Sequence, residues 1–165
     1  MNHSTEVPWL VRYGDDAPDG LAGYTGDVVQ APRATAMDSL QDMRRGGLRV
    51  GAVLVCLVHE LVQIPITPGE GPWHWPPSRT LCHPRITRCS TADGSEMGYR
   101  PCLGRFWLLP HDTSELLTDG AVLYDVLCTV RSRRRLGSAA RRAGRRRIGP
   151  EPRQASGGLY EDWLA

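Results

Sequence analysis

The residues best able to do chemistry in this 165-residue chain are arginines gathered toward its C-terminal end. Residues 126–150 contain nine arginines and no acidic residue, whereas residues 1–125 contain ten arginines and fifteen acidic residues. A guanidinium group is a planar fork of donors that matches phosphate, and closely spaced cations attract polyanions. The segment therefore predicts salt-dependent binding to DNA or RNA without preference for base sequence. The nine arginines are Arg131, Arg133, Arg134, Arg135, Arg141, Arg142, Arg145, Arg146 and Arg147.

Two other interpretations of this basic segment remain open. It could bind an acidic protein partner, or the chain's own acidic part, as a protein-interaction or regulatory module would. It could also be a solvated tail, because all twenty basic residues of the chain are arginine, a bias typical of a GC-rich genome.

Cysteine and histidine form the second group with chemical potential. Cys82, His83, Cys89 and Cys102 fall within 21 residues of one another. Structural zinc sites usually contain ligand pairs separated by about two to four residues. Six residues separate Cys82 from Cys89, and Cys102 has no close partner. We therefore expect core or surface thiols and no bound metal.

Catalytic motifs are largely missing from the sequence. It contains no G-x-S-x-G elbow and no Walker loop, and His59-Glu60 lacks the second histidine of a zinc-peptidase motif. We expect no complete catalytic site, and Asp27 is the one candidate that we retain.

Hydrophobic periodicity and turn residues predict the elements that position these groups. Helices are expected from a cap at Thr35 to Arg45, and from a cap at Thr118 to a frayed end near Gly137. The order of elements predicts an α+β fold, a small mixed or antiparallel sheet with two helices. Strands are expected at residues 26–29, 48–58, 61–66, 86–89 and 105–109.

The same pattern predicts how the chain is divided. Residues 1–25 are expected to be a loose N-terminal segment, 26–136 a single α+β domain, and 137–165 a flexible, disordered basic arm and tail. The longest apolar stretch, Val50–Val58, is far short of a membrane span, and the N-terminus has no signal-like apolar run. We therefore expect a cytoplasmic protein with no membrane partner and with reduced cysteines.

Several short motifs resemble those of short actinobacterial proteins related to the N-terminal domain of bifunctional DNA primase/polymerases. One begins at Asp27-Val28-Val29 and Pro32, continues with a helix ending at Arg45-Gly46, and resumes at Val50-Gly51. Another joins the strand Gly104–Pro110 to Leu117-Thr118-Asp119. Together the motifs span roughly residues 24–131.

This resemblance implies an RRM-like core and, in active relatives, an Asp-x-Asp pair that holds Mg²⁺ or Mn²⁺ for nucleotidyl transfer. If Asp27 is the first acid, the second position is Val29, which cannot bind metal. We therefore expect a degenerate, non-catalytic primase/polymerase-like domain that needs no cofactor and associates with nucleic acid through its arginines. The alternative is a residual nucleotidyl transferase that uses Asp27 and requires Mg²⁺ or Mn²⁺.

Overall fold

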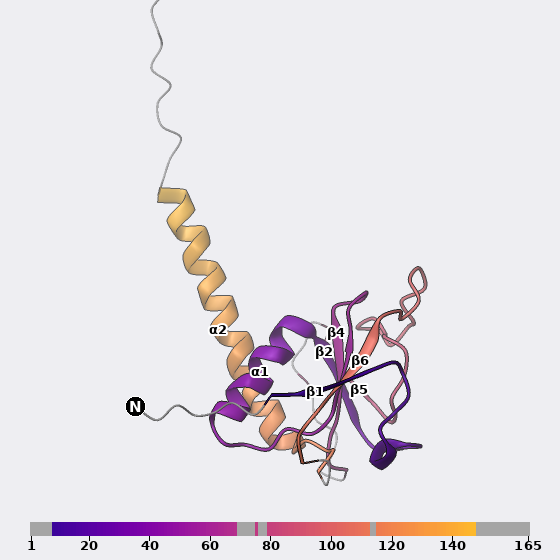
Figure 1. The fold of residues 1–165 in the computed structure, drawn as a ribbon. Helices are drawn as coiled ribbons and strands as arrows, with labels where there is room; N and C mark the ends of the chain where they lie inside the picture. Colours follow the sequence, from indigo (N-terminus) through magenta and orange to yellow (C-terminus); the bar gives the residue numbers. More distant parts are fainter. Residues whose placement is uncertain (1–7, 69–74, 76–78, 113–114, 148–165) are drawn as a thin grey trace, which may run out of the picture. The chain divides into compact units, whose positions relative to one another are not determined.

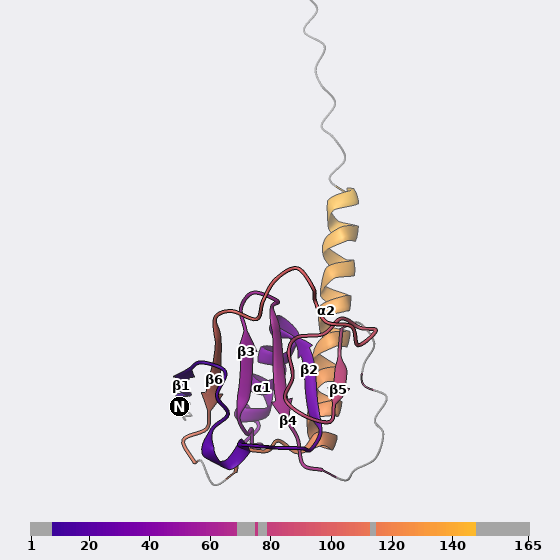
Figure 2. The same ribbon diagram turned by 90° about the vertical axis from the view of Figure 1, so that its right-hand side faces the viewer.

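Six strands form one antiparallel sheet, and two helices pack on one of its faces (Figures 1 and 2). This confirms the predicted α+β class with a small antiparallel sheet and two helices. The computed structural model describes residues 8–68, 75, 79–112 and 115–147. The strands are β1 Leu10–Tyr13, β2 Val28–Pro32, β3 Val53–Cys56, β4 Leu61–Pro65, β5 Leu81–His83 and β6 Arg105–Leu109. The helices are α1 Arg33–Arg45, α2 Gly120–Arg147 and the short 3-10 turn η1 Asp19–Leu21.

The strand order across the sheet is β1-β6-β3-β4-β2-β5. Strands β2 and β3 both pair antiparallel with β4, so they run parallel to each other and α1 connects them. The unit β2-α1-β3-β4 is thus a split βαβ arrangement, as in ferredoxin-like folds. In the second half of the chain, β5 pairs with β2 at the edge of the sheet, and no described helix precedes it. Helix α2 follows β6 instead. The RRM-like core therefore stays a prediction.

One face of the sheet carries the main apolar core. Side chains alternate between the two faces along each strand, which places Val29 and Val55 on the side of the helices. Leu40 of α1 and Leu123 and Leu127 of α2 are at most 2% exposed and pack in the same cluster. This burial anchors the first turns of α2 to the sheet.

The opposite face is covered by loops and carries polar side chains. Leu54 and Trp107 pack there against Leu21 of η1. Gln30 and Gln63 are also buried on this face, at 0% and 2% exposure. Buried amides must find hydrogen-bond partners, and both find them in the segment that connects β5 to β6.

Several element boundaries differ from those predicted. Residues 10–13, expected to be loose, form the edge strand β1 by pairing with β6. Their side chains are all exposed, so the strand depends on backbone pairing and leaves little hydrophobic signal. Residues 81–83 form β5, whereas 86–89 form no strand. Helix α1 begins directly after Pro32, two residues before the predicted cap at Thr35.

Helix α2 also continues past its predicted end. Its backbone is helical to Arg147, so the helix extends about ten residues beyond the end predicted near Gly137. Arginine and alanine are good helix formers, and each of the two interior glycines, Gly137 and Gly144, costs only about 1 kcal/mol. The chain divides into two compact units, Met1–Ser132 and Arg133–Ala165. Residues 1–7 and 148–165 of the predicted terminal segments lie outside the described residues.

Candidate functional site

The second half of α2 arranges its arginines as a stripe. An α-helix advances about 100° per residue, so five of the six arginines with described side chains fall within an arc of about 120°. Arg133 lies on the other side of the helix. Of these five, Arg131 is half-buried and the others are exposed. The five residues, called the arginine stripe here, are Arg131, Arg134, Arg135, Arg141 and Arg142.

Side-chain hydrogen bonds stabilise α2 at its N-terminus and in its basic half. The Val122 N–H donates to Asp119 Oδ1 at 2.9 Å, which makes Asp119 the N-terminal cap in place of Thr118. The Thr118 hydroxyl instead accepts from the Gly51 N–H at 3.0 Å and ties α2 to the start of β3. Within the basic half, the Ser138 hydroxyl donates to the Arg135 carbonyl at 2.8 Å.

The stripe concentrates positive charge. No acidic residue occurs between residues 126 and 150. Arg131 and Arg135 are four residues apart on one face, a spacing at which like charges destabilise a helix. A bound polyanion would reduce this repulsion. The predicted site residues Arg145, Arg146 and Arg147 continue the helical backbone, and their side chains lie outside the described part.

Asp27, the catalytic candidate, directly precedes β2. Its carbonyl oxygen accepts a hydrogen bond from the Ile66 N–H at 2.9 Å. Burial, followed by the charge of Asp27, raises the pKa of both the Tyr24 phenol and the Cys82 thiol. Val29 is fully buried in the core beneath the helices. Among the described residues, Asp27 belongs to no group of three or more side chains that could share a metal ion.

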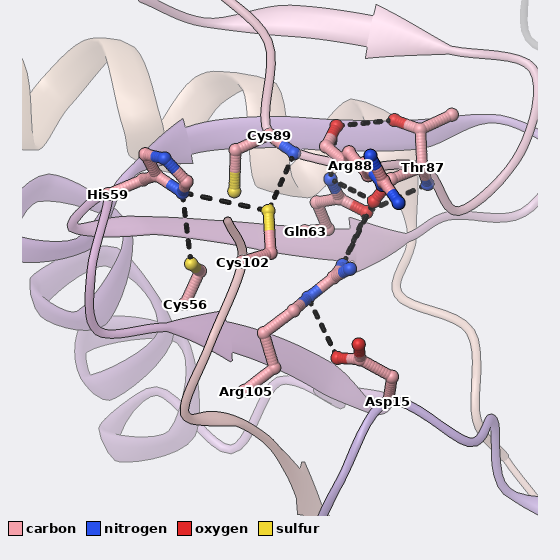
Figure 3. A network of polar contacts seen from close by, with 9 residues as sticks. All are labelled: Asp15, Cys56, His59, Gln63, Thr87, Arg88, Cys89, Cys102 and Arg105. Carbon is pink, nitrogen blue, oxygen red and sulfur yellow. Dashed lines mark hydrogen bonds and ion pairs between the residues drawn. The ribbon is translucent and has the colours of Figure 1, made fainter. Parts of the chain in front are cut away.

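A cluster of three thiols and an imidazole lies on the loop-covered face (Figure 3). Cys56 ends β3, and His59 stands in the turn that leads to β4. Cys89 and Cys102 come from the segment between β5 and β6. The possible ligand atoms of these four side chains all lie within 4.8 Å of one another. We call this group the Cys–His cluster.

Short contacts connect the members of the Cys–His cluster. His59 Nδ1 lies 3.3 Å from Cys56 Sγ and 3.6 Å from Cys102 Sγ. The Cys89 N–H donates to Cys102 Sγ at 3.4 Å. Burial raises the pKa of the Cys89 thiol, and the neighbouring Cys56 and Cys102 thiols raise it further. A nearby cation would favour the opposite, thiolate form.

Polar side chains of the sheet hold Cys89 in place (Figure 3). Gln63 Nε2 donates to the Thr87 carbonyl at 3.0 Å, and the Thr87 N–H donates to Gln63 Oε1 at 3.2 Å. Arg105 Nη2 also donates to the Thr87 carbonyl, at 2.9 Å, while its Nε lies 3.3 Å from Asp15 Oδ1 as an ion pair. Cys89 follows two residues after Thr87, so these bonds hold the backbone just before it.

The structure thus brings together a different set of possible metal ligands from the one considered in the sequence. Cys89 and Cys102 enter the Cys–His cluster, whereas Cys82 and His83 lie on the edge strand β5 and do not. From the sequence, Cys56 is placed only in a strand and His59 is considered as a ligand only for a zinc-peptidase motif, so neither is recognised as part of this group. Their C-x₂-H spacing across a hairpin turn is a signal that could have found them.

Comparisons with protein-family models, curated proteins and solved structures find no match to this chain. The relationship to primase/polymerases therefore stays a prediction. Within the described residues, no helix combines the length and the apolar composition needed to cross a bilayer.

Proposed function

We propose that the protein associates with nucleic acid through the phosphate backbone, using the arginine stripe of α2. The observation that carries this proposal is the placement of five arginines within one arc of α2, in a part of the helix, residues 126–147, that contains no acidic residue. Exposed guanidinium groups on one helical face can contact a continuous phosphate surface together.

The dimensions of the stripe suit a nucleic-acid strand. From Arg131 to Arg142 the helix rises about 16 Å, at about 1.5 Å per residue. Duplex DNA carries one phosphate charge per roughly 1.7 Å of its axis, so roughly ten charges, counted over both strands, lie along that length, about twice the number of stripe arginines. Each guanidinium can therefore find a phosphate partner. Because these contacts reach no base edge, binding is independent of base sequence.

The proposed role is non-catalytic. Nucleotidyl transfer requires carboxylates that clamp metal ions at the reacting oxygens. Within the described residues, no such group surrounds Asp27. We accordingly propose a cytoplasmic, primase/polymerase-like protein that retains nucleic-acid association without transfer activity. An incorporation assay with Mn²⁺ tests this point: we expect the wild-type chain and Asp27→Ala to be equally inactive, and activity lost on that substitution would restore the enzyme hypothesis.

Two variants of equal charge test the stripe. The stripe variant replaces four exposed arginines of α2 with glutamine, a residue of similar helix propensity. The body variant removes the same charge from four exposed arginines of the first unit. The stripe variant carries Arg134→Gln, Arg135→Gln, Arg141→Gln and Arg142→Gln. The body variant carries Arg12→Gln, Arg45→Gln, Arg85→Gln and Arg100→Gln.

Binding of each full-length protein to a labelled duplex is measured by fluorescence anisotropy at low salt. At somewhat under 1 kcal/mol per exposed contact, the stripe variant should bind about 100-fold more weakly than wild type. The body variant should lose less than about tenfold. Equal losses in the two variants would show that net charge alone, and not the stripe, governs binding.

A further inference from the structure

We propose that Cys56, His59, Cys89 and Cys102 bind one Zn²⁺ ion. Tetrahedral zinc, with bonds of about 2.3 Å to sulfur and about 2.0 Å to nitrogen, places a sulfur and a nitrogen ligand about 3.6 Å apart. The observed separations from His59 Nδ1 are 3.3 Å to Cys56 Sγ and 3.6 Å to Cys102 Sγ. These two nitrogen–sulfur separations match the spacing that the ion requires, and all four possible ligand atoms lie within 4.8 Å of one another.

The donor set selects the metal. Three sulfurs and one imidazole nitrogen are soft to intermediate ligands, which favour zinc over magnesium or calcium. Among the residues that the structure describes, no carboxylate belongs to the cluster. Four protein ligands complete a tetrahedral shell and leave no position for substrate or water, so the site is structural rather than catalytic.

The backbone around the cluster has features of a metal site. Cys56 and His59 are separated by two residues across the β3–β4 turn, a spacing that lets one turn supply two ligands. Glu60, the next residue, has a φ of 52°, a left-handed conformation that bends the chain sharply after His59. The Cys89 N–H points to Cys102 Sγ, as outer-shell donors do toward metal-bound thiolates.

The zinc ion would stabilise a segment that has little apolar core of its own. Between Cys89 and Cys102 the chain forms a polar turn in which Thr91, Asp93 and Ser95 bond to one another. The apolar cluster beneath this segment is small, with Leu61 as its one fully buried aliphatic residue. A metal joining both ends of the segment to the β3–β4 turn supplies the cross-link that a core would otherwise provide.

The first test measures the metal content of full-length protein purified under reducing conditions from cells grown with zinc. We expect about one Zn²⁺ per chain in the wild type. Cys89→Ser and Cys102→Ser should lower the bound zinc at least tenfold. Cys82→Ser and Cys128→Ser are matched controls outside the cluster and should retain it. Wild-type protein without zinc, or equal losses in cluster and control variants, would overturn the proposal.

A second test does not depend on how well the serine variants fold. Wild-type protein and His59→Cys are stripped of metal under reducing conditions and titrated with Co²⁺. Tetrahedral thiolate coordination gives intense visible bands and a sulfur-to-cobalt charge-transfer band. We expect saturation at one equivalent in both proteins, with stronger charge transfer in His59→Cys because a fourth sulfur joins the shell. Identical spectra would exclude His59 as a ligand, and the absence of such bands would exclude the site.

This inference does not rest on the proposed function of α2. Zinc content and cobalt spectra report on the first unit of the chain, whereas DNA binding reports on the stripe. Each proposal can therefore fail while the other stands.

Discussion

Gln30 and Ser90 are joined by a pair of hydrogen bonds between a side chain and a backbone. Gln30 Nε2 donates to the Ser90 carbonyl at 2.8 Å, and the Ser90 N–H donates to Gln30 Oε1 at 3.0 Å. The side-chain amide of Gln30 on β2 thus pairs with the backbone of the β5–β6 segment as a neighbouring strand would. Gln63 and Thr87 repeat the arrangement on β4. These two glutamine side chains hold the β5–β6 segment against the sheet in a region with few apolar contacts.

The first prediction concerns this amide pair. Gln30→Leu leaves the N–H and carbonyl of Ser90 without their partner in a site that is 8% exposed. Each buried unpaired group costs about 1–3 kcal/mol, so we expect the free energy of unfolding to fall by about 2–4 kcal/mol. Urea denaturation measures the change. Gln41→Leu, on the exposed side of α1, is the control and should change it by less than about 0.5 kcal/mol. Similar losses in both variants would contradict the role assigned to Gln30.

A second prediction concerns the close approach before β3. A Cβ added at Gly51 would overlap the backbone of Leu116 and lie 2.7 Å from the Leu117 carbonyl carbon. Backbone cannot rotate away as a side chain can, so Gly51→Ala should destabilise the fold by about 2 kcal/mol or more. Thermal and urea unfolding report the change. Gly98→Ala has no heavy atom within 4 Å of the new Cβ and should be nearly neutral. A stable Gly51→Ala protein would disprove the predicted clash.

A third prediction concerns pH. Burial lowers the pKa of His83 from its ordinary value of 6.5, and its Nε2 has no hydrogen-bond partner among the described residues. The unfolded chain therefore binds a proton at a higher pH than the folded protein. The stability contribution of neutral His83 is fully present above pH 6.5 and is lost as pH falls toward the lowered folded pKa.

The measurement compares urea unfolding of wild type and His83→Gln at pH 7.5 and 5.5, values on the two sides of the unfolded histidine pKa of about 6.5. Wild type should lose more stability on acidification than His83→Gln does. Because other titrating groups are common to both proteins, the difference between their pH dependences isolates His83. Parallel pH profiles would mean that His83 titrates alike in the folded and unfolded chains.

Elements with strong local patterns were predictable from the sequence. Residues 105–109 combine aromatic and aliphatic side chains before a proline, and β6 has these same bounds. The end of α1 at Arg45 followed from its two terminal arginines and the following glycine. The start of α1 did not follow, because Pro32 precedes the helix with no side-chain cap to mark it.

Elements that depend on distant partners were not predictable. Strand β1 exists because β6 offers an open edge, and its own side chains are exposed. The Cys–His cluster brings together His59 and Cys102, which are 43 positions apart and have strands β4 and β5 between them in the sequence. Spacing along the chain can suggest the Cys56–His59 pair but cannot place two loop cysteines beside it. The arginine stripe was predictable in composition, while its angular arrangement needed α2 to continue beyond Gly137.

The salt dependence of DNA binding tests the central claim most directly. For the wild-type chain, the logarithm of the association constant should fall linearly with the logarithm of salt concentration. Each phosphate contact contributes about 0.9 to the slope, so five stripe arginines predict a magnitude of at least about 4. The stripe variant should reduce that magnitude by about 3 to 4. An unchanged slope in the stripe variant, or no wild-type binding in dilute buffer, would contradict the account.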